Sequence, residues 1–474
     1  MYRKEYTETI FRTGSHTSRK SSVKQHEMAA LREMEQMILA AEAVPAGAEA
    51  LERATAHLEQ FLQQVRQKRI LDEKQRAMEA FRQQFENGYT WRNGFLRNVA
   101  RFGDREALIE PESGTVWTYT QLNAEANRFS HALLRAGLQK GDVVMVQLHN
   151  CPEFVFAYLA CHKTGMVFCP VNFRLSAKEI TDCMDNSRPK VFLLEPETQA
   201  EVDMALRRTA HAPQILLTTD ARAAHAYADF TADCPATEPE LPWELSVYDE
   251  TLRLFTSGTT GRQKSVCLTS INEVLSAHDV MIHFPFSFTD RSMNTTPWFH
   301  RGGLHSGGIT PTLYAGGTVI IQRKFQPEKT LDMVQQYGLT FLIGVPNVLE
   351  LLAEAQQKQP RDLSSLRGIV TMGSPLERAD CIRYQKILTK RIFNGYGTTE
   401  TFWNTFLRPD DLPEMAGSAG RSCVDDDVRV IKVYEDRVAE PDDLAATDGS
   451  EVGEVIIRSN AKLSLIHISE TTRP

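Results

Sequence analysis

Between residues 91 and 459 the pattern of hydrophobic and polar residues alternates between short apolar runs, typical of strands, and longer segments with helical spacing. Short apolar or β-branched runs at 143–148, 166–171 and 190–195 are typical of buried strands. Longer segments, among them 120–137 and 152–163, have the helical spacing of apolar residues. Strands that alternate with helices predict an α/β fold of helix-covered, mostly parallel sheets.

The end of the chain follows a different pattern. After Gly417 the segments 427–433 and 451–459 read as strands, which predicts a small β subdomain. Residues 220–250 are polar and contain three prolines, so we expect a connecting loop there.

Residues 28–88 are rich in good helix formers, and the break at Val44–Gly47 predicts two helices that form a hairpin. Apolar residues in steps of three and four form a coiled-coil-like seam on the second helix: Leu51, Ala54, Leu58, Phe61, Val65, Leu71, Met78, Phe81 and Phe85. Packing of the pair on itself or on the main domain is the first interpretation. An arm that forms a homodimer is the second.

Composition narrows the class of protein. The chain has 474 residues, 42% of them hydrophobic, and a net charge of −8, which favours a globular protein and gives no support for a nucleic-acid partner. No apolar run is long enough for a transmembrane segment. Residues 1–27 are basic without a secretory apolar region, so we expect a disordered tail, or a start at Met28, in a cytoplasmic protein. The eight cysteines form no CxxC pair, which favours reduced thiols.

The stretch LFTSGTTGRQKS, residues 254–265, has the composition of a phosphate-binding loop. In a Walker A motif that starts at Gly258, Lys264 is in register, but Gln263 stands where a glycine is required. Residues 265–269 predict a strand, and the next helix starts at Thr269 or Ser270, with Glu273 placed for a capping box. A strand after the loop disfavours a P-loop NTPase, whose loop must lead into a helix.

Three further segments follow in order: TTPWFHRGGLHSGG at 295–308, DLSSLRGIVTMGSPL at 362–376 and FNGYGTTE at 393–400. Taken alone, His300 is more often a packing residue, and GYGTTE could be a turn that caps a helix. Together with TSGTTGRQKSV, they resemble the adenylate-forming superfamily, the acyl-CoA synthetases and their relatives. That family's loop reads T-S-G-T-T-G-x-P-K-G-V; here Gln263 replaces the proline and Ser265 the second glycine.

The resemblance implies the large N-terminal domain of the adenylate-forming fold over residues 89–459, and it implies roles for individual residues. Catalytic roles fall to Lys264, Glu400 and His300, with His300 beside the acyl and thiol tunnel and Glu400 as the ligand of Mg²⁺. Tyr396 would lie against adenine and Thr398 would reach phosphate. The remaining nucleotide-binding residues are Thr256, Ser257, Gly258, Thr259, Thr260, Gly261, Gly373, Ser374, Pro375, Asn394, Gly395 and Gly397.

The implied activity is that of an AMP-forming acid–thiol ligase, which activates a small-molecule carboxylic acid with ATP and Mg²⁺ and passes the acyl group to coenzyme A. A non-catalytic nucleotide-binding or scaffold protein is the alternative. Aromatic residues, among them Phe402, Trp403, Phe406 and Trp298, would line an apolar acyl pocket or pack in the core.

Past Arg458 the resemblance ends. The family continues with a T-G-D segment, a hinge and a small C-terminal lid domain that carries a catalytic lysine, and none of these appears in the sequence. Residues 460–474 resemble an in-frame translation of a sequencing-library adapter. We therefore expect a gene fragment with an artefactual end, which adenylates poorly.

Overall fold

The computed structural model describes residues 47–257 and 263–459. It divides into two compact units, residues 1–82 and 83–474. The predicted first helix of the hairpin, the basic tail at 1–27 and the segment 460–474 lie outside the described residues.

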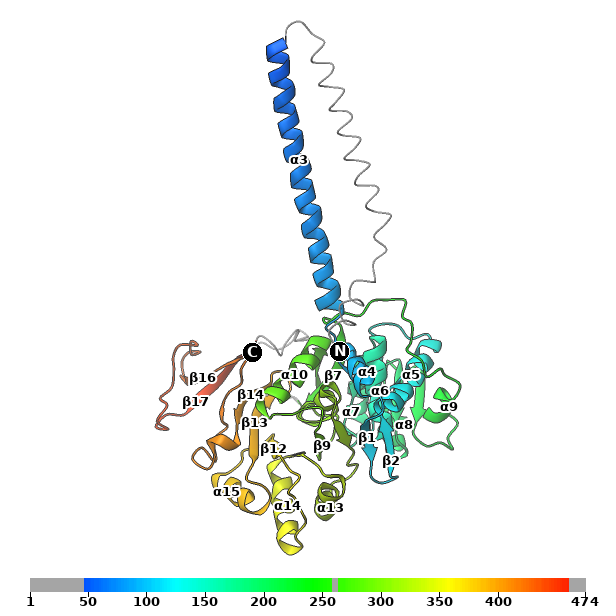
Figure 1. Ribbon diagram of the computed structural model, residues 1–474. Helices are drawn as coiled ribbons and strands as arrows, with labels where there is room; N and C mark the ends of the chain where they lie inside the picture. Colours follow the sequence, from blue (N-terminus) through cyan, green and yellow to red (C-terminus); the bar gives the residue numbers. More distant parts are fainter. Residues whose placement is uncertain (1–46, 258–262, 460–474) are drawn as a thin grey trace, which may run out of the picture. The chain divides into compact units, whose positions relative to one another are not determined.

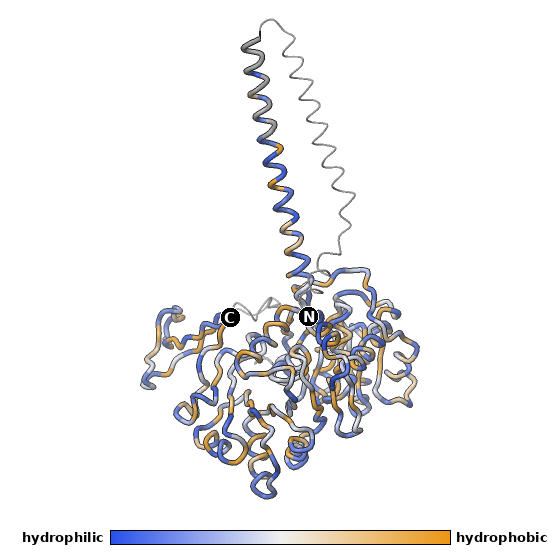
Figure 2. The backbone as a smooth tube through the Cα atoms, in the orientation of Figure 1, coloured by the Kyte–Doolittle hydropathy of each residue, from blue (hydrophilic) through white to orange (hydrophobic). Residues whose placement is uncertain are grey.

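The described part of the first unit consists of the long helix α3 (Gly47–Phe81). A short π-helix, η1 (Arg82–Asn87), follows it in the chain, and all but its first residue belong to the second unit. The part of α3 coloured in Figure 2 is mostly hydrophilic with isolated apolar positions. Leu71 and Met78 of the predicted seam are exposed. The helical hairpin and the homodimer stay predictions, because the partner helix is not described.

Two sheets form the centre of the second unit. The first has the strand order β6-β5-β3-β4-β7-β8, and its pairs are parallel except for the antiparallel hairpin β7–β8. Every residue of β3 is buried, as expected for a strand with helices on both faces. Its strands are β3 (Val143–Gln147), β4 (Val167–Pro170), β5 (Val191–Leu194), β6 (Ile215–Thr218), β7 (Glu250–Ser257) and β8 (Gln263–Thr269).

The second sheet has nine strands in the order β15-β14-β13-β12-β11-β9-β10-β1-β2. Its centre is parallel, and antiparallel pairs close both edges. Its strands are β1 (Glu106–Glu110), β2 (Thr115–Thr118), β9 (Arg291–Asn294), β10 (Thr318–Ile320), β11 (Phe341–Gly344), β12 (Gly368–Met372), β13 (Ile392–Thr398), β14 (Phe402–Leu407) and β15 (Arg421–Ser422).

Helices pack beside these sheets and cover them (Figure 1). Local sequence fixes several of their ends: Thr118 caps α5 with a capping box to Gln121, and Ser176 does the same for α7 with Glu179. The helices are α4 (Trp91–Phe102), α5 (Tyr119–Arg135), α6 (Pro152–Thr164), α7 (Ala177–Ser187), α8 (Gln199–Leu206), α9 (Tyr227–Thr231), α10 (Ser270–His283), α11 (Arg301–His305), α12 (Ile309–Ala315), α13 (Pro327–Tyr337), α14 (Pro346–Lys358) and α15 (Arg378–Ile387), with short 3₁₀ turns η2 (Pro196–Thr198) and η3 (Pro409–Asp411).

The predicted α/β fold with helix-covered, mostly parallel sheets is confirmed. The small β element is the antiparallel hairpin of β16 (Asp426–Lys432) and β17 (Gly453–Ser459). The polar segment 220–250 is largely irregular but contains the short helix α9. All eight cysteines are buried and free, as expected for reduced thiols. Within the described ranges, no helix has the length and apolar character needed to cross a membrane.

Candidate functional site

The predicted phosphate loop joins the two strands of the hairpin β7–β8. Thr256 pairs with Lys264, and Ser257 pairs with Gln263, at the end of this hairpin. Thr256 is partly buried and Lys264 is exposed, so the lysine is accessible to a ligand. Gly258, Thr259, Thr260 and Gly261 lie outside the described residues.

The strand after the loop decides between the two kinds of phosphate loop. β8 runs for seven residues after the loop, and the next helix, α10, begins only at Ser270. A Walker loop needs a helix N-terminus directly behind its phosphates. The geometry therefore excludes a P-loop NTPase at this motif, as the sequence predicted.

The predicted capping role of Glu273 is wrong. Thr269 is the N-cap of α10, and the capping box forms with Asn272, three residues further on. A box with Glu273 would need Ser270 as the cap, but Ser270 is already helical and its hydroxyl accepts a hydrogen bond from the Trp91 backbone N–H at 2.9 Å. Glu273 is instead fully buried.

The residues predicted to lie beside adenine are found at the carboxyl ends of β12 and β13, two adjacent strands of the larger sheet. Gly373, Ser374 and Pro375 follow the carboxyl end of β12 and are exposed, and Gly373 has a φ of +83°, a conformation that favours glycine. β13 runs parallel to β12, with Met372 opposite Gly395. The ring of Tyr396, 41% exposed, is accessible at these carboxyl ends, which is where ligands bind in parallel α/β sheets.

Asn394 and Gly395 lie in the same strand but are buried. The side-chain oxygen of Asn394 has no hydrogen-bond partner among the described residues. Gly397 leaves no room for a side chain, since a Cβ there would lie 1.4 Å from the Phe402 carbonyl oxygen. The glycine is therefore needed for the close approach of β13 and β14.

Glu400 lies in the tight turn between β13 and β14. The Thr398 and Thr401 hydroxyls are 2.9 Å apart, and the Thr401 hydroxyl also donates to Asn404 at 2.6 Å. Glu400 is partly exposed and has no hydrogen bond or ion pair to the described part of the chain. The interpretation of GYGTTE as a helix cap is wrong, because a strand follows the turn.

Phe402, directly after this turn, has a φ of +60°. A left-handed backbone is unusual for an aromatic residue and costs on the order of 1–3 kcal/mol. The buried ring stacks on Trp403 at 4.7 Å between centroids and lies edge-on to His305 at 5.8 Å. These contacts hold the residue that ends the turn.

His300 is the N-cap residue of α11 and is exposed. Its ring lies 4.1 Å from that of Phe299, and Phe299 contacts Phe173 at 5.5 Å. Desolvation by the neighbouring protein atoms lowers the pKa of His300, which favours the neutral imidazole. The proximity of His300 to an acyl tunnel stays a prediction.

A buried polar network lies behind the site, and the sequence did not predict it. Glu273 accepts from Tyr158 at 2.7 Å and lies 2.7 Å from the His305 Nε2 atom. Burial alone would raise the pKa of Glu273, but the charge and hydrogen bond of His305 outweigh it and hold the pKa at about 2. The adjacent His162 has a pKa lowered to about 4, because the ring is buried. The sequence signal that could have indicated it is the helical i, i+4 spacing of Tyr158 and His162 in α6.

The helix α10 packs against two of the segments singled out in the sequence. It begins at the carboxyl end of β8 and contacts α11 and β14. Arg301 of α11 donates to Ser276 of α10 at 3.1 Å and lies over the ring of Phe402 at 5.4 Å. The segments at 301–305 and 402–407 are thus both neighbours of this helix, whereas Lys264 lies at the opposite end of β8 from it.

The aromatic residues considered for an acyl pocket are mainly core residues. Phe402, Trp403 and Phe406 belong to one buried cluster with Phe284 and Phe286. Trp298 is buried in a different cluster. This arrangement supports the packing interpretation.

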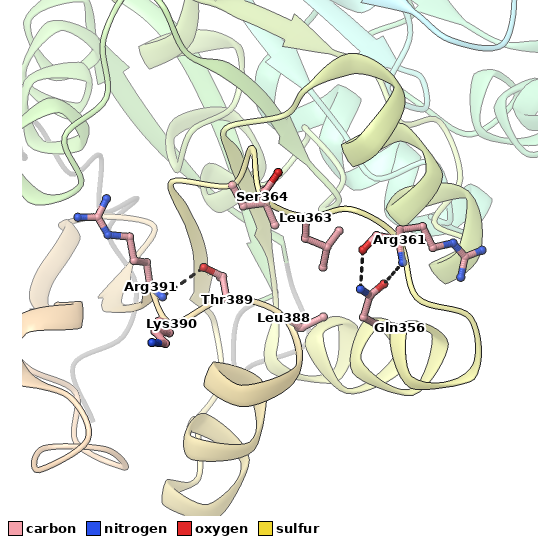
Figure 3. Close-up of a pocket in the computed structure, with 9 residues that line it drawn as sticks. Gln356, Arg361, Leu363, Ser364, Leu388, Thr389, Lys390 and Arg391 are labelled. Atoms are coloured by element: carbon pink, nitrogen blue, oxygen red, sulfur yellow. Dashed lines mark hydrogen bonds between the residues drawn. The ribbon is translucent and has the colours of Figure 1, made fainter.

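An open hollow of about 550 Å³ lies away from the candidate site (Figure 3). Arg391 and Thr389 precede β13, and Ser364 precedes β12, so the hollow lies at the amino ends of these strands. The predicted nucleotide residues lie at the carboxyl ends. None of them lines the hollow.

Comparison with known proteins identifies the class to which this fold and site belong. Residues 95–464 match the model of the AMP-binding enzyme family, and the chain belongs to this family. It is 31% identical to an indoleacetate–CoA ligase of Aromatoleum aromaticum over 69% of this chain and 65% of the relative. A feruloyl-CoA synthase of Amycolatopsis is 32% identical over 69% of this chain and 64% of the relative.

Solved structures agree with the fold. The N-terminal domain of FACL13 from Mycobacterium tuberculosis superposes with a TM-score of 0.68 at 25% identity, over 79% of this chain and 90% of that domain. The anthranilate CoA ligase AuaEII gives a TM-score of 0.70 at 20% identity, over 79% of this chain and 69% of that protein. The chain thus spans about two thirds of the length of the curated relatives named above and most of an N-terminal domain.

Proposed function

We propose that the chain is the nucleotide-binding part of an AMP-forming acid–thiol ligase, which joins a carboxylic acid to coenzyme A at the cost of ATP. The observation that carries the proposal is the exposed surface at the carboxyl ends of two adjacent parallel strands, where Ser374 follows β12 and Tyr396 lies in β13, with Glu400 in the turn after β13. Membership of the AMP-binding enzyme family and the CoA ligases among the similar proteins support it.

The chemistry requires two displacements. A carboxylate is a poor electrophile, because its oxide is a poor leaving group. Attack of one carboxylate oxygen on the α-phosphorus of ATP forms acyl-AMP and releases pyrophosphate. The thiol of coenzyme A then attacks the acyl carbon and AMP leaves. Positioning and charge neutralisation lower the first barrier without a general base.

Different residues in the described part of the chain are suited to binding the phosphates and the adenine of ATP. Lys264 is accessible and offers a mobile cation for the β- and γ-phosphates, with the hydroxyl of Thr256 opposite it in the hairpin. The exposed ring of Tyr396 offers a face for adenine beside Ser374 and Pro375.

Glu400 fits the requirement of a Mg²⁺ site. Magnesium in nucleotide sites takes one or two carboxylates and completes its shell with phosphate oxygens and water. Glu400 forms no hydrogen bond or ion pair with the described residues, so its carboxylate oxygens are available to a metal ion. No group of three acidic, His or Cys side chains gathers among the described residues. Bound Mg²⁺ would neutralise the phosphate charge.

Calorimetric titration with ATP tests the proposal. Wild-type chain should bind ATP more tightly with Mg²⁺ than without, and Glu400→Gln should remove that gain, roughly tenfold in Kd. Glu112→Gln, an exposed carboxylate elsewhere, is the matched control. Equal binding with and without Mg²⁺ by wild type would contradict the role of Glu400.

A second assay separates the ligase from a non-catalytic nucleotide-binding protein. ATP–pyrophosphate exchange is measured with indoleacetate, ferulate, anthranilate and a long-chain fatty acid, the acids named in the similar ligases. Exchange that depends on one of these acids supports the ligase. ATP binding without exchange, together with no calorimetric binding of any of these acids, favours the scaffold alternative.

A further inference from the structure

Arg301 is a buried cation whose hydrogen-bonding capacity is largely unused. Its side chain lies in the interior, with the residue only 4% exposed. Nη2 donates to the Ser276 hydroxyl, but Nε and Nη1 have no hydrogen-bond partner among the described residues. A buried donor without a partner costs about 1–3 kcal/mol, and more for a charged group. The position is therefore unfavourable unless a ligand completes it.

Acidic side chains nearby do not fill this role. Glu273, Asp279 and Glu400 are close enough to attract the guanidinium electrostatically. Glu273 is engaged by His305 and Tyr158, and none of the three forms a hydrogen bond with the unused nitrogens. Burial still lowers the pKa of Arg301 to about 10, which leaves the group charged at neutral pH.

The contacts of the guanidinium place it close to the turn that carries Glu400. One of its flat faces lies over the ring of Phe402, two residues after Glu400. Arg301 also follows His300 directly in α11. Phe402 keeps its left-handed backbone in this contact, and strained residues that are held by packing gather at ligand sites.

From this geometry we propose that Arg301 binds an oxyanion of the reactants next to Glu400, either the α-phosphate of ATP or the carboxylate of the acid. Both are oxygen anions that accept charge-assisted hydrogen bonds from a guanidinium. The inference rests on the proposed ligase function. It adds a residue to the reaction site that the motifs do not assign.

The test measures the affinity of the variants Arg301→Met and Arg301→Lys for the nucleotide and for the acid in separate titrations. Titration with ATP·Mg and with AMP reports on the phosphate, and titration with the four acids named above, in the presence of AMP, reports on the carboxylate. Arg301→Met should weaken one of the two at least tenfold, and Arg301→Lys less. Arg222→Met, on an exposed side chain, is the control. Thermal unfolding first verifies that each variant is folded.

The outcomes are distinct. Weaker binding of ATP and AMP indicates that Arg301 binds the α-phosphate. Weaker binding of the acid alone indicates that Arg301 binds the carboxylate. Unchanged binding of every ligand by folded Arg301→Met overturns the inference, while failure of wild type to bind ATP or any acid overturns the proposed function instead. If Arg301→Met does not fold, the ¹⁵Nε resonance of Arg301 in wild type decides. It should shift on addition of ATP·Mg or acid, and an unchanged resonance under saturation would overturn the inference.

Discussion

The two hairpins of the candidate site are both antiparallel strand pairs, but they differ in whether their key side chains are accessible or buried. At the end of β7–β8 the functional side chains are accessible: Lys264 is exposed and Thr256 only partly buried. At β13–β14 the partly exposed Glu400 is followed two residues later by the buried Phe402, which packs against Trp403. In the first hairpin the accessible side chains are available to a ligand, whereas in the second a buried ring stabilises the fold. Substitution of Lys264 should therefore lower ATP affinity, and substitution of Phe402 should lower the free energy of unfolding.

The largest effect is expected for Phe402. Phe402→Ala should lower the free energy of unfolding by about 3–5 kcal/mol, as large-to-small substitutions of buried rings do. Phe402→Gly loses the same ring but relieves the positive φ, so it should be more stable than the alanine variant by roughly 1 kcal/mol. Urea denaturation measures both.

The control is Phe406, a buried neighbour in the same strand whose φ is not positive. There the glycine variant should be the less stable of the two, by about 0.5–1 kcal/mol. The same order of alanine and glycine at both positions would contradict the strain assigned to Phe402.

In the first hairpin, Lys264→Ala should change affinity and leave stability unaltered. Loss of a charge-assisted contact of about 1.5–3 kcal/mol weakens ATP·Mg binding by roughly one to two orders of magnitude. Lys178→Ala, at another exposed lysine, should bind ATP like wild type. A large drop in melting temperature for Lys264→Ala would show that packing matters in this hairpin too.

A smaller effect should appear in the acid stability of the network behind the second hairpin. His162 is buried between Trp91 and Tyr158, with a folded pKa of about 4 against an ordinary value of 6.5. Between these values the unfolded chain binds more protons, so stability falls as pH drops from 6.5 toward 4. The loss from pH 7 to pH 5 is at most about 2 kcal/mol.

His162→Phe should remove this part of the pH dependence, because a phenyl ring has no proton to bind. Urea midpoints at pH 7 and pH 5 measure the difference. His225→Phe, at an exposed histidine, is the control and should keep the wild-type slope. An unchanged slope in His162→Phe would contradict the lowered pKa.

The sequence predicted what local patterns determine. Period and composition predicted β3, β4 and β5, and the run SVCLT predicted the strand that excludes a Walker loop. It could not predict which carboxylate becomes buried. Glu273 was placed in a capping box, whereas Asn272 takes that role and Glu273 meets His305 from another helix. Such pairs depend on how α10 and α11 pack, and no local spacing encodes this.

The same limit applies to the second hairpin. The motif GYGTTE predicted the turn that carries Glu400, but neither the left-handed Phe402 nor the unused donors of Arg301 follow from it. Both arise from contacts between segments about a hundred residues apart in the sequence. The motifs identified candidate site residues, whose roles stay predictions, but they did not indicate the packing that positions these residues.

The most direct measurement of the central claim is where adenine binds. Photolabelling of the chain with 8-azido-ATP and Mg²⁺, followed by mass spectrometry of the peptides, reports this position. The account predicts labelled peptides that contain Ser374 or Tyr396, suppressed by excess ATP. Specific labelling confined to the hollow around Arg361 and Arg391, or absent from both β12 and β13 ends, would contradict it.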